Sequence, residues 1–564
     1  MLLLIGITWN ARTVDSLARL YPEIEPYLLV VKATLPSTPR AQVRTILRRL
    51  CRDGKGKACR MVCDRLAAKG SPVVSTPPCP KTYTVLKHLY RRTRRLSYLV
   101  DIGRLYPKSK EAKRLLKMKV SRKLKLKILL AHGKYREVMK RADTTDPEEY
   151  PLYLMAKFHL KGLTFSEVLK LPPKYRKRPL IKHLVRFLKK EDYDSIELAL
   201  LELIKLGDYE RAYRITASEV AKPFLRYEAS DLYIRMAATS HEGLSAGSFI
   251  WLGLAAYGVH YVEDAYNYFV AARERAETGS FVWTQATYWL YRLTMDTTYV
   301  RELRLHNPVS YYYLDLNLPI PWKDEDVWDT TGSLRNYRIG KVLEEIGGWG
   351  LAFPWYAKDV PSGYRRVREL LSEGNFLRAS YLLARIYRVA PKERGVPRWW
   401  GRMAFPYDLY REEIDSAAKE FGVDPLFLTA IVREESRFKS RARSRVGAMG
   451  LAQIMPFNVR NFSRAMGERV RNPYDPLTNL RMGAFFLQRD FALYGSPHLV
   501  AAAYNAGREA VNRWLCDYGY EMLEFHHFVD IIPYNETRNY VRRVIRSYAV
   551  YKSLYGRFGN SLKH

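Results

Sequence analysis

A short phrase made of a glycine, an aromatic residue and a small aliphatic residue recurs between apolar helical stretches over residues 81–389. Copies occupy residues 133–138, 207–212 and 374–379, and a slipped copy begins at Gly258. In each copy the glycine can end one helix in a left-handed conformation, and the small residue lets the next helix approach closely. Helical hairpins joined in this way stack and bury their faces against their neighbours. Because the copies are irregularly spaced, we predict a degenerate superhelix of stacked helical hairpins.

The remaining patterning sets the fold class and the expected domain boundaries. Few stretches alternate apolar and polar residues as strands do, so the chain is predicted to be mainly α. We assign residues 1–80 to an N-terminal region of unclear structure, which ends in a proline-rich linker at 71–80 that no helix can cross. The superhelix is expected over residues 81–404, followed by a second helical domain over residues 405–564.

The first seven residues, Met1 to Ile7, are almost entirely apolar. They resemble the centre of a secretory signal peptide without its basic start, and a buried first strand or helix is an equally good interpretation. No stretch of the chain reaches the ~18 apolar residues that a membrane-spanning helix needs. Export is therefore left open by this segment.

Four of the five cysteines lie close together in the sequence, at Cys51, Cys59, Cys63 and Cys79. They contain no Cys-x-x-Cys pair and match no standard zinc pattern, so a zinc site is the least favoured interpretation. Two local disulfides in an exported protein and four free thiols in a reducing compartment both fit the spacing. Cys516 lies inside a helical pattern and is interpreted as a small core residue.

A helix–helix junction is predicted where Gly422 closes one helix, Asp424 caps the next and Pro425 occupies its first turn. Glu435 continues the apolar face of that second helix. A carboxyl there is partly desolvated, which raises its pKa as a general acid requires. Glu434 lies about 100° around the helix and cannot share this role. Taken alone, such a glutamate is more often a paired structural residue. The face consists of Leu428, Ile431, Val432 and Glu435.

Four sequence blocks favour a catalytic role for Glu435 over a structural one, because together they resemble those of the soluble lytic transglycosylase family. They lie at residues 430–438, 447–456, 502–507 and 532–541. In order they are similar to the family's Glu-Ser, Gly-Leu-Met-Gln-Ile-Met-Pro, Ala-Tyr-Asn-Ala-Gly and Pro-x-x-Glu-Thr-Arg-x-Tyr-Val blocks. Ala452 replaces the usual Met, and Asn539 stands where Gly is usual. Four ordered blocks within about 110 residues are far more specific than one short motif.

The resemblance covers roughly residues 408–555 and implies a lysozyme-like α or α+β catalytic domain after the superhelix. It implies cleavage of peptidoglycan glycan strands by a monomer that needs no metal or other cofactor. A location in the periplasm or cell envelope follows from the same resemblance. The helical region before it is similar to the family's α-superhelix only in being built of successive helices.

The resemblance also assigns roles to individual residues. Glu435 is the implied catalytic acid, and the implied substrate-binding residues are Ser444, Gly450, Gln453, Tyr504, Asn505, Glu536 and Tyr540. Gly450, together with Gly447, would let the backbone approach a sugar closely. Gln453 would hydrogen-bond the substrate, or alternatively stabilise its own loop.

Further alternatives remain for the last two blocks. Tyr504 and Asn505 would orient an N-acetyl group or hold the catalytic carboxyl, and Tyr504 has core packing as an alternative. Glu536 would lie in the cleft, or form a purely architectural buried pair with Arg538. A run of five basic residues after Glu435 is expected to point away from it, because their charges would lower its pKa. These are Arg437, Lys439, Arg441, Arg443 and Arg445.

The other acids in the blocks are Glu536, whose role in its motif looks structural, and Glu434, which faces elsewhere. This favours a single-acid scheme over ordinary glycoside hydrolysis. In the scheme that the resemblance implies, Glu435 protonates the oxygen leaving from N-acetylmuramic acid, and the substrate's N-acetyl carbonyl stabilises C1. Glu435 then deprotonates the C6 hydroxyl, which attacks C1 and gives a 1,6-anhydro end. The alternatives are a hydrolase resembling goose-type lysozyme and a non-enzymatic scaffold that binds peptidoglycan.

The formal net charge of +36 predicts an anionic partner or surface. Residues 406–564 hold 23 Lys and Arg against 17 Asp and Glu, so most of the excess precedes them. Residues 81–127 alone hold 17 basic and 2 acidic side chains. We expect them to contact the anionic stem peptides of the wall; an anionic lipid surface and a solvated helix face are the alternatives. Nucleic acid is not expected, since no base-reading motif with interleaved aromatics is present.

Overall fold

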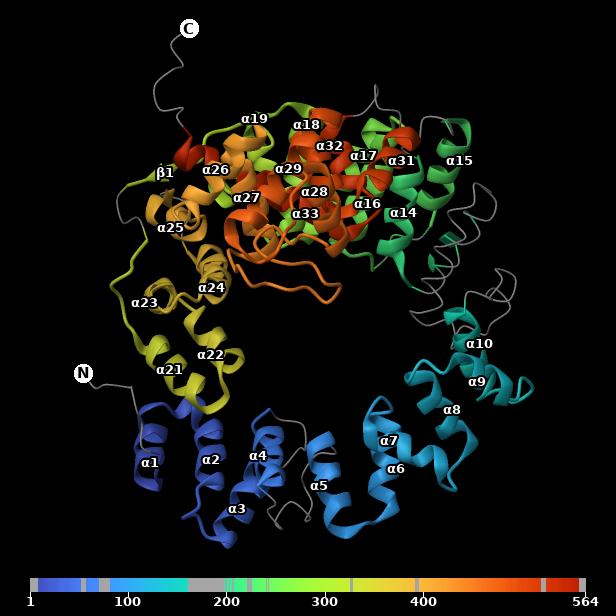
Figure 1. Ribbon diagram of the computed structural model, residues 1–564, viewed down its shortest axis with the longest axis vertical. Helices are drawn as coiled ribbons and strands as arrows, with labels where there is room; N and C mark the ends of the chain where they lie inside the picture. The colour runs from blue at the N-terminus through green and yellow to red at the C-terminus, as the bar shows by residue number, and fades with distance from the viewer. Residues whose placement is uncertain are drawn as a thin grey trace. The chain divides into compact units, whose positions relative to one another are not determined.

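The computed structural model is almost entirely helical and divides into two compact units (Figure 1). The first unit comprises Met1–Asp192 and Arg335–Trp355, and the second comprises Tyr193–Leu334 and Tyr356–His564. The expected signal-like segment 1–7 and the proline-rich run 71–80 lie outside the described residues. The structure describes residues 9–51, 57–69, 82–160, 197, 200–201, 203–204, 207–220, 226–239, 241, 243–324, 328–390, 395–518 and 524–556.

The first unit is a succession of short helices in which each packs mainly on its neighbours in sequence. Its helices are α1 (Ala11–Leu20), α2 (Glu25–Thr34), α3 (Arg40–Leu50), α4 (Lys57–Ala68), α5 (Tyr83–Thr93), α6 (Leu96–Leu105), α7 (Lys110–Arg114), α8 (Arg122–Ala131), α9 (Tyr135–Arg141), α10 (Tyr150–His159), α21 (Arg335–Gly347) and α22 (Trp349–Tyr356), with short 3-10 turns at Pro22–Ile24 and Leu115–Lys117.

A distant segment completes this first unit. Helix α21 packs against α2 (Figure 1), and the side chain of Arg65 on α4 donates a hydrogen bond to the carbonyl of Ile346. Arg335 forms an ion pair of 2.7 Å with Glu23. A Cβ at Gly347 would lie 2.8 Å from the Leu351 side chain and 3.0 Å from the end of Met61 on α4, so glycine suits the close approach of the two segments.

The second unit contains the remaining described helices and a two-residue parallel strand pair. Its elements are α14 (Tyr209–Val220), α15 (Arg226–Ala237), α16 (Ala246–Gly258), α17 (Val262–Arg275), α18 (Phe281–Thr294), α19 (Thr297–His306), α20 (Tyr311–Leu314), β1 (Trp322–Lys323), α23 (Val360–Ser372), α24 (Phe376–Val389), β2 (Val396–Pro397), α25 (Arg398–Ala404), α26 (Arg411–Phe421), α27 (Pro425–Ser436), α28 (Pro456–Met466), α29 (Pro476–Tyr494), α30 (Pro497–Ala506), α31 (Arg508–Tyr518), α32 (Phe525–Ile531) and α33 (Asn535–Tyr555). The prediction of a mainly α chain is confirmed.

The recurring glycines act as the sequence analysis predicted. Gly133, Gly207 and Gly374 all have positive φ, of 75°, 73° and 69°, and an added Cβ would meet no crowding closer than 4.0 Å at any of them. The backbone conformation, and not space, therefore requires glycine at these turns. In the slipped copy, Gly258 stays helical and His260 takes the left-handed conformation, with φ of 64°.

A fully buried carboxylate joins the N-terminal helices of the second unit to its C-terminal helices. Asp530 on α32 accepts hydrogen bonds from Gln285 and Trp289 on α18, at 2.9 and 2.7 Å, and from Tyr312 on α20, at 2.9 Å. Arg542 on α33 forms an ion pair with the same carboxylate. Four donors on three other helices thus hold α32 in place.

No helix among the described residues combines the length and apolarity needed to cross a membrane.

Candidate active site

Local sequence signals place Glu435 at the end of a buried helix. Gly422 ends α26 with φ of 63°, and the Asp424 carboxylate accepts a 2.7 Å hydrogen bond from the Leu426 N–H at the start of α27. Pro425 occupies the first turn, as predicted. Helix α27 ends at Ser436, one residue after Glu435.

The Glu435 side chain is largely buried, and its carboxyl has one direct polar partner in the described chain. The Tyr540 hydroxyl on α33 donates a 2.6 Å hydrogen bond to Glu435 Oε1. Burial raises the pKa of Glu435 from 4.5 to about 7; the Tyr540 hydrogen bond and Arg543 oppose this rise, whereas the charges of Glu434 and Glu536 add to it. A carboxyl with this pKa can donate a proton near neutral pH and take one back afterwards.

Two tyrosines act as neutral groups beside this carboxyl. Burial and the Glu435 charge hold the pKa of Tyr540 well above its ordinary value, and the same two causes raise that of Tyr504. The Tyr504 hydroxyl donates a 2.8 Å hydrogen bond to the carbonyl of Ala452. Tyr504 therefore ties α30 to the loop between α27 and α28, on which Ser444, Gly450 and Gln453 lie.

That loop is held by polar contacts, several of them from a residue that the sequence analysis missed. Asn479 on α29 is fully buried; its amide donates to the carbonyls of Met449 and Pro473 at 3.0 and 2.7 Å, and accepts from the Ala452 N–H at 2.7 Å. A Cβ at Gly450, with φ of 78°, would lie 2.3 Å from the Asn479 side chain. Gly450 is thus required by Asn479, and contact with a sugar is not needed to explain it. No short motif surrounds Asn479 to mark it in the sequence.

The other loop residues form local hydrogen bonds. The Gln453 amide donates to the carbonyls of Gly450 and Ala442 at 2.8 and 3.3 Å, which matches the loop-stabilising alternative. The Ser444 hydroxyl accepts a 2.9 Å hydrogen bond from the Ala448 N–H. Both side chains keep partial exposure.

The last block lies on α33 and the turn before it. Asn505 on α30 accepts a 2.7 Å hydrogen bond from the Thr537 hydroxyl, which links the third block to the fourth. Of the two alternatives for Glu536, the architectural buried pair with Arg538 is wrong. Glu536 is exposed, and Arg538 donates to the Ile532 carbonyl and to Asn535, because its side chain folds back over the start of α33.

The basic run after Glu435 divides into two groups. Lys439, Arg441, Arg443 and Arg445 are exposed, as predicted. Arg437 is three-quarters buried and forms a 3.2 Å ion pair with Glu434, whose own side chain is only 1% exposed.

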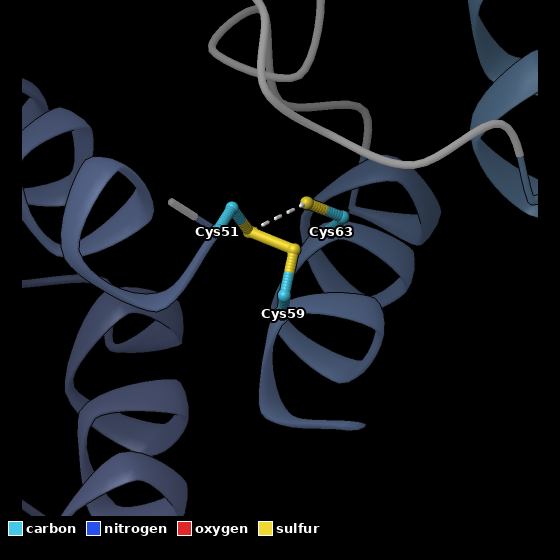
Figure 2. A group of neighbouring side chains, drawn as sticks. All are labelled: Cys51, Cys59 and Cys63. Atoms are coloured by element: carbon cyan, nitrogen blue, oxygen red, sulfur yellow. Dashed lines mark hydrogen bonds between the residues drawn. A yellow bond between two sulfur atoms is a disulfide. The ribbon is translucent and has the colours of Figure 1, made fainter. Parts of the chain in front are cut away.

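The cysteines offer the only described group of side chains with the spacing of a metal site. Cys51, Cys59 and Cys63 place their sulfur atoms within 4.8 Å of one another (Figure 2). Cys51 and Cys59 form a disulfide, so the interpretation as four free thiols is wrong for this pair. Cys79 lies outside the described residues. Cys516 was predicted to be buried and is instead exposed, because α31 turns that face to solvent.

Comparisons with known proteins show what the C-terminal region is similar to. The family model described as "Transglycosylase SLT domain" matches residues 412–521. Residues 412–521 are thus similar to this domain family. The soluble lytic murein transglycosylase of Escherichia coli K12 is 36% identical over 135 residues, which are 23% of this chain and 21% of that protein. A transglycosylase of Enterobacteria phage PRD1 is 31% identical over 118 residues, covering 21% of this chain and 38% of that protein. The matched stretch spans about a fifth of the length of the enterobacterial relatives.

The solved structures extend the likeness of fold beyond the SLT domain. The 70-kDa soluble lytic transglycosylase of E. coli has a TM-score of 0.56 and 16% identity, over 96% of this chain and 94% of that one. A complex of a 70-kDa soluble lytic transglycosylase with bulgecin A has a TM-score of 0.57 over the same shares. The predicted fold class, a helical superhelix followed by a lysozyme-like domain, is confirmed.

Proposed function

We propose that this protein is a peptidoglycan lytic transglycosylase and that Glu435 is its single catalytic acid and base. The observation that carries the proposal is the largely buried Glu435 carboxyl, with a pKa of about 7, at the end of a helix within the segment that matches the SLT domain model. The relatives described above are transglycosylases, which is in line with the proposal.

The carboxylate adjacent to Glu435 in the sequence cannot serve as a second catalytic group. Ordinary glycosidases place two carboxyl groups on either side of the scissile bond. Glu434, the residue before Glu435, has a buried side chain and is ion-paired. The surrounding arginines lower its pKa to about 2, even though burial opposes this shift. It can neither reach a substrate nor exchange protons near neutral pH.

In the proposed reaction, Glu435 transfers its proton to the glycosidic oxygen that leaves C1 of N-acetylmuramic acid. The substrate's own N-acetyl carbonyl stabilises the positive charge at C1. The Glu435 carboxylate then removes the proton of the C6 hydroxyl, whose oxygen attacks C1 and closes a 1,6-anhydro ring. Tyr540 supports the carboxylate stage, since its hydrogen bond to Glu435 favours the anion.

Mass spectrometry of peptidoglycan digested by the full-length protein tests this directly. The expected products end in 1,6-anhydro-N-acetylmuramic acid and are one water lighter than lysozyme products. Reducing muramic ends as the main product would make the protein a hydrolase, and binding without product would make it a scaffold.

The Glu435→Gln variant tests the residue assignment. Turnover should fall by several orders of magnitude while the fold is kept, because one carboxyl performs both proton transfers. Glu420→Gln is the matched control: Glu420 pairs with Arg481 at 2.7 Å in an exposed ion pair on α26 and α29. Normal clearing of peptidoglycan by folded Glu435→Gln would refute the assignment.

The remaining predicted site residues are proposed to bind substrate or to shape the site. Their contacts support a division of roles. Tyr540 holds Glu435, whereas Gly450, Gln453 and Tyr504 hold the loop beside it. The others are Ser444, Asn505 and Glu536, of which Glu536 is exposed and available to a ligand. Residues 405–564 are proposed as the catalytic segment.

The basic region 81–127 is proposed to contact anionic stem peptides of the wall. Thirteen of its basic side chains are exposed: Arg91, Arg92, Arg94, Arg95, Arg104, Lys108, Lys110, Lys113, Arg114, Lys117, Lys119, Arg122 and Lys127. Attraction by such a surface is screened over about 8 Å at physiological ionic strength. Replacing the four arginines of 91–95 by glutamate should weaken sedimentation with insoluble peptidoglycan, and added salt should weaken it in the unaltered protein. Salt-independent binding would refute this contact.

A peptidoglycan substrate also implies where the protein works. We propose a periplasmic or cell-envelope location and a monomer that acts without a cofactor. The Cys51–Cys59 disulfide supports an oxidising compartment. Fractionation of cells that express the full-length protein tests the location.

A further inference from the structure

A second carboxylate next to Glu435 has no place in the proposed reaction. Glu434 is only 1% exposed and forms ion pairs with Arg433 on α27, with Arg437 directly after that helix and with Arg543 on α33. The Ser547 hydroxyl on α33 adds a 2.7 Å hydrogen bond to the same carboxylate. We call Arg433, Arg437 and Arg543 the arginine cage.

The cage brings three positive charges onto one negative charge at the joint between α27 and α33. Arg433 is itself buried, donates to the Ala404 carbonyl at 3.0 Å and lies over the Phe405 ring at 4.0 Å. Arg437 and Arg543 keep 25% and 43% of their side chains exposed. A buried charge is tolerated only when it is paired, so Glu434 is the group that makes this cluster possible.

The same cluster acts on the catalytic carboxyl. The groups whose charge or hydrogen bond acts on Glu435 are Glu434 on its own helix, Tyr540, Arg543 and Glu536 on α33, and Tyr504 on α30. The Glu434 charge opposes ionisation of Glu435, while the Arg543 charge favours it. Without Glu434, the cage arginines would present unbalanced positive charge beside the proton donor.

We propose that Glu434 is a positioning residue that holds the cage arginines to itself and so keeps the neighbouring Glu435 carboxyl protonated and ready to donate. This inference rests on the proposed function. A purely structural clamp between α27 and α33 would use the same ion pairs, but it would leave the ionisation of Glu435 unchanged.

Two substitutions that should shift the pKa of Glu435 in opposite directions test the proposal in the full-length protein. In the proposed reaction the alkaline limb of the kcat/KM profile reports the proton on Glu435. Glu434→Gln should move this limb to lower pH by about one pH unit, because a repelling charge is lost and the cage is left uncompensated. Arg543→Gln should move it to higher pH, because an attracting charge is lost. Glu420→Gln, the same change at an exposed ion pair, should leave the limb and the activity unchanged.

Carbon-13 NMR titration of the Glu435 carboxyl in the absence of substrate gives the same two shifts independently of catalysis. Opposite shifts in the two variants support the proposal, whereas no shift, or shifts in one direction, would overturn it. If Glu434→Gln does not fold, the Arg543→Gln titration decides alone, since that side chain is partly exposed. If the Glu435 pKa shifts in opposite directions in the two variants but the protein cleaves no glycan, the proposed function is refuted while the control of Glu435 by Glu434 stands.

Discussion

The raised pKa of Glu435 should make the folded protein less stable than it would be with a neutral side chain at that position. The pKa is 4.5 for an ordinary glutamate and about 7 here, so the folded state binds this proton more tightly than the unfolded chain does. The resulting stabilisation is complete below pH 4.5 and is lost as the pH rises towards 7. With 1.36 kcal/mol per pKa unit, the loss amounts to about 3 kcal/mol.

Glu435→Gln removes this dependence, because glutamine is neutral at every pH and its carbonyl can still accept the Tyr540 hydrogen bond. The difference in the free energy of unfolding between the variant and the unaltered protein should therefore grow by about 3 kcal/mol between pH 4 and pH 8. The variant should be the more stable protein at pH 8 and the less active one. A catalytic group is thus expected to cost stability in the pH range where it works.

The assay is urea unfolding of the full-length proteins at pH 4 and pH 8, with Glu420→Gln as the reference for loss of a carboxylate from an exposed ion pair. Taking the difference between variants at each pH cancels the titration of all other groups. A pH-dependent gain of less than about 1 kcal/mol would refute the reasoning, since it would mean that Glu435 ionises in the folded protein as an ordinary carboxyl does.

Three further substitutions probe other contacts. Tyr540→Phe removes the hydrogen bond that favours the Glu435 anion, so the pKa of Glu435 should rise and the alkaline limb of the activity profile should move up by about one to two pH units; an unmoved limb would contradict this. Asp530→Ala leaves Arg542 buried without its partner and should cost about 3–5 kcal/mol in urea unfolding, and a loss below about 1 kcal/mol would show that the carboxylate is dispensable. Cys51→Ala opens a disulfide with a sequence separation of 8 and should lower the stability of the first unit by about 2–3 kcal/mol, measured by thermal unfolding under non-reducing conditions.

Local signals were enough to predict the elements around Glu435. A left-handed Gly422, the Asp424 cap and Pro425 at the first turn act within a few residues, and each is found where the sequence placed it. The left-handed glycines of the hairpin turns are local for the same reason. Such features depend on backbone conformation and nearby hydrogen bonds, so one sequence carries them fully.

Long-range contacts were beyond the reach of the same patterns. Asn479 holds a loop about thirty residues before it, and nothing beside it in the sequence indicates that loop. The spacing of Glu536 and Arg538 suggested a pair, but the fold directs their side chains apart. Glu434 was correctly placed off the catalytic face, yet its partner Arg543 lies on α33, more than a hundred residues further along the chain. Periodicity tells which face a residue occupies and not what that face meets.

The first unit is discontinuous, and this has a consequence for the order in which the chain can fold. Helices α21 and α22 close its core only after residues 193–334, about 140 residues of the other unit, have been made. Helix α21 begins about 270 residues after α4 ends, so at roughly 5–20 residues per second the early hairpins wait on the order of ten to fifty seconds for their last partners. During that wait the face of α2 that α21 will cover is open to water and to other nascent chains. The Cys51–Cys59 bridge needs only local chain, so in an oxidising compartment it can hold the α3–α4 hairpin together before α21 and α22 pack.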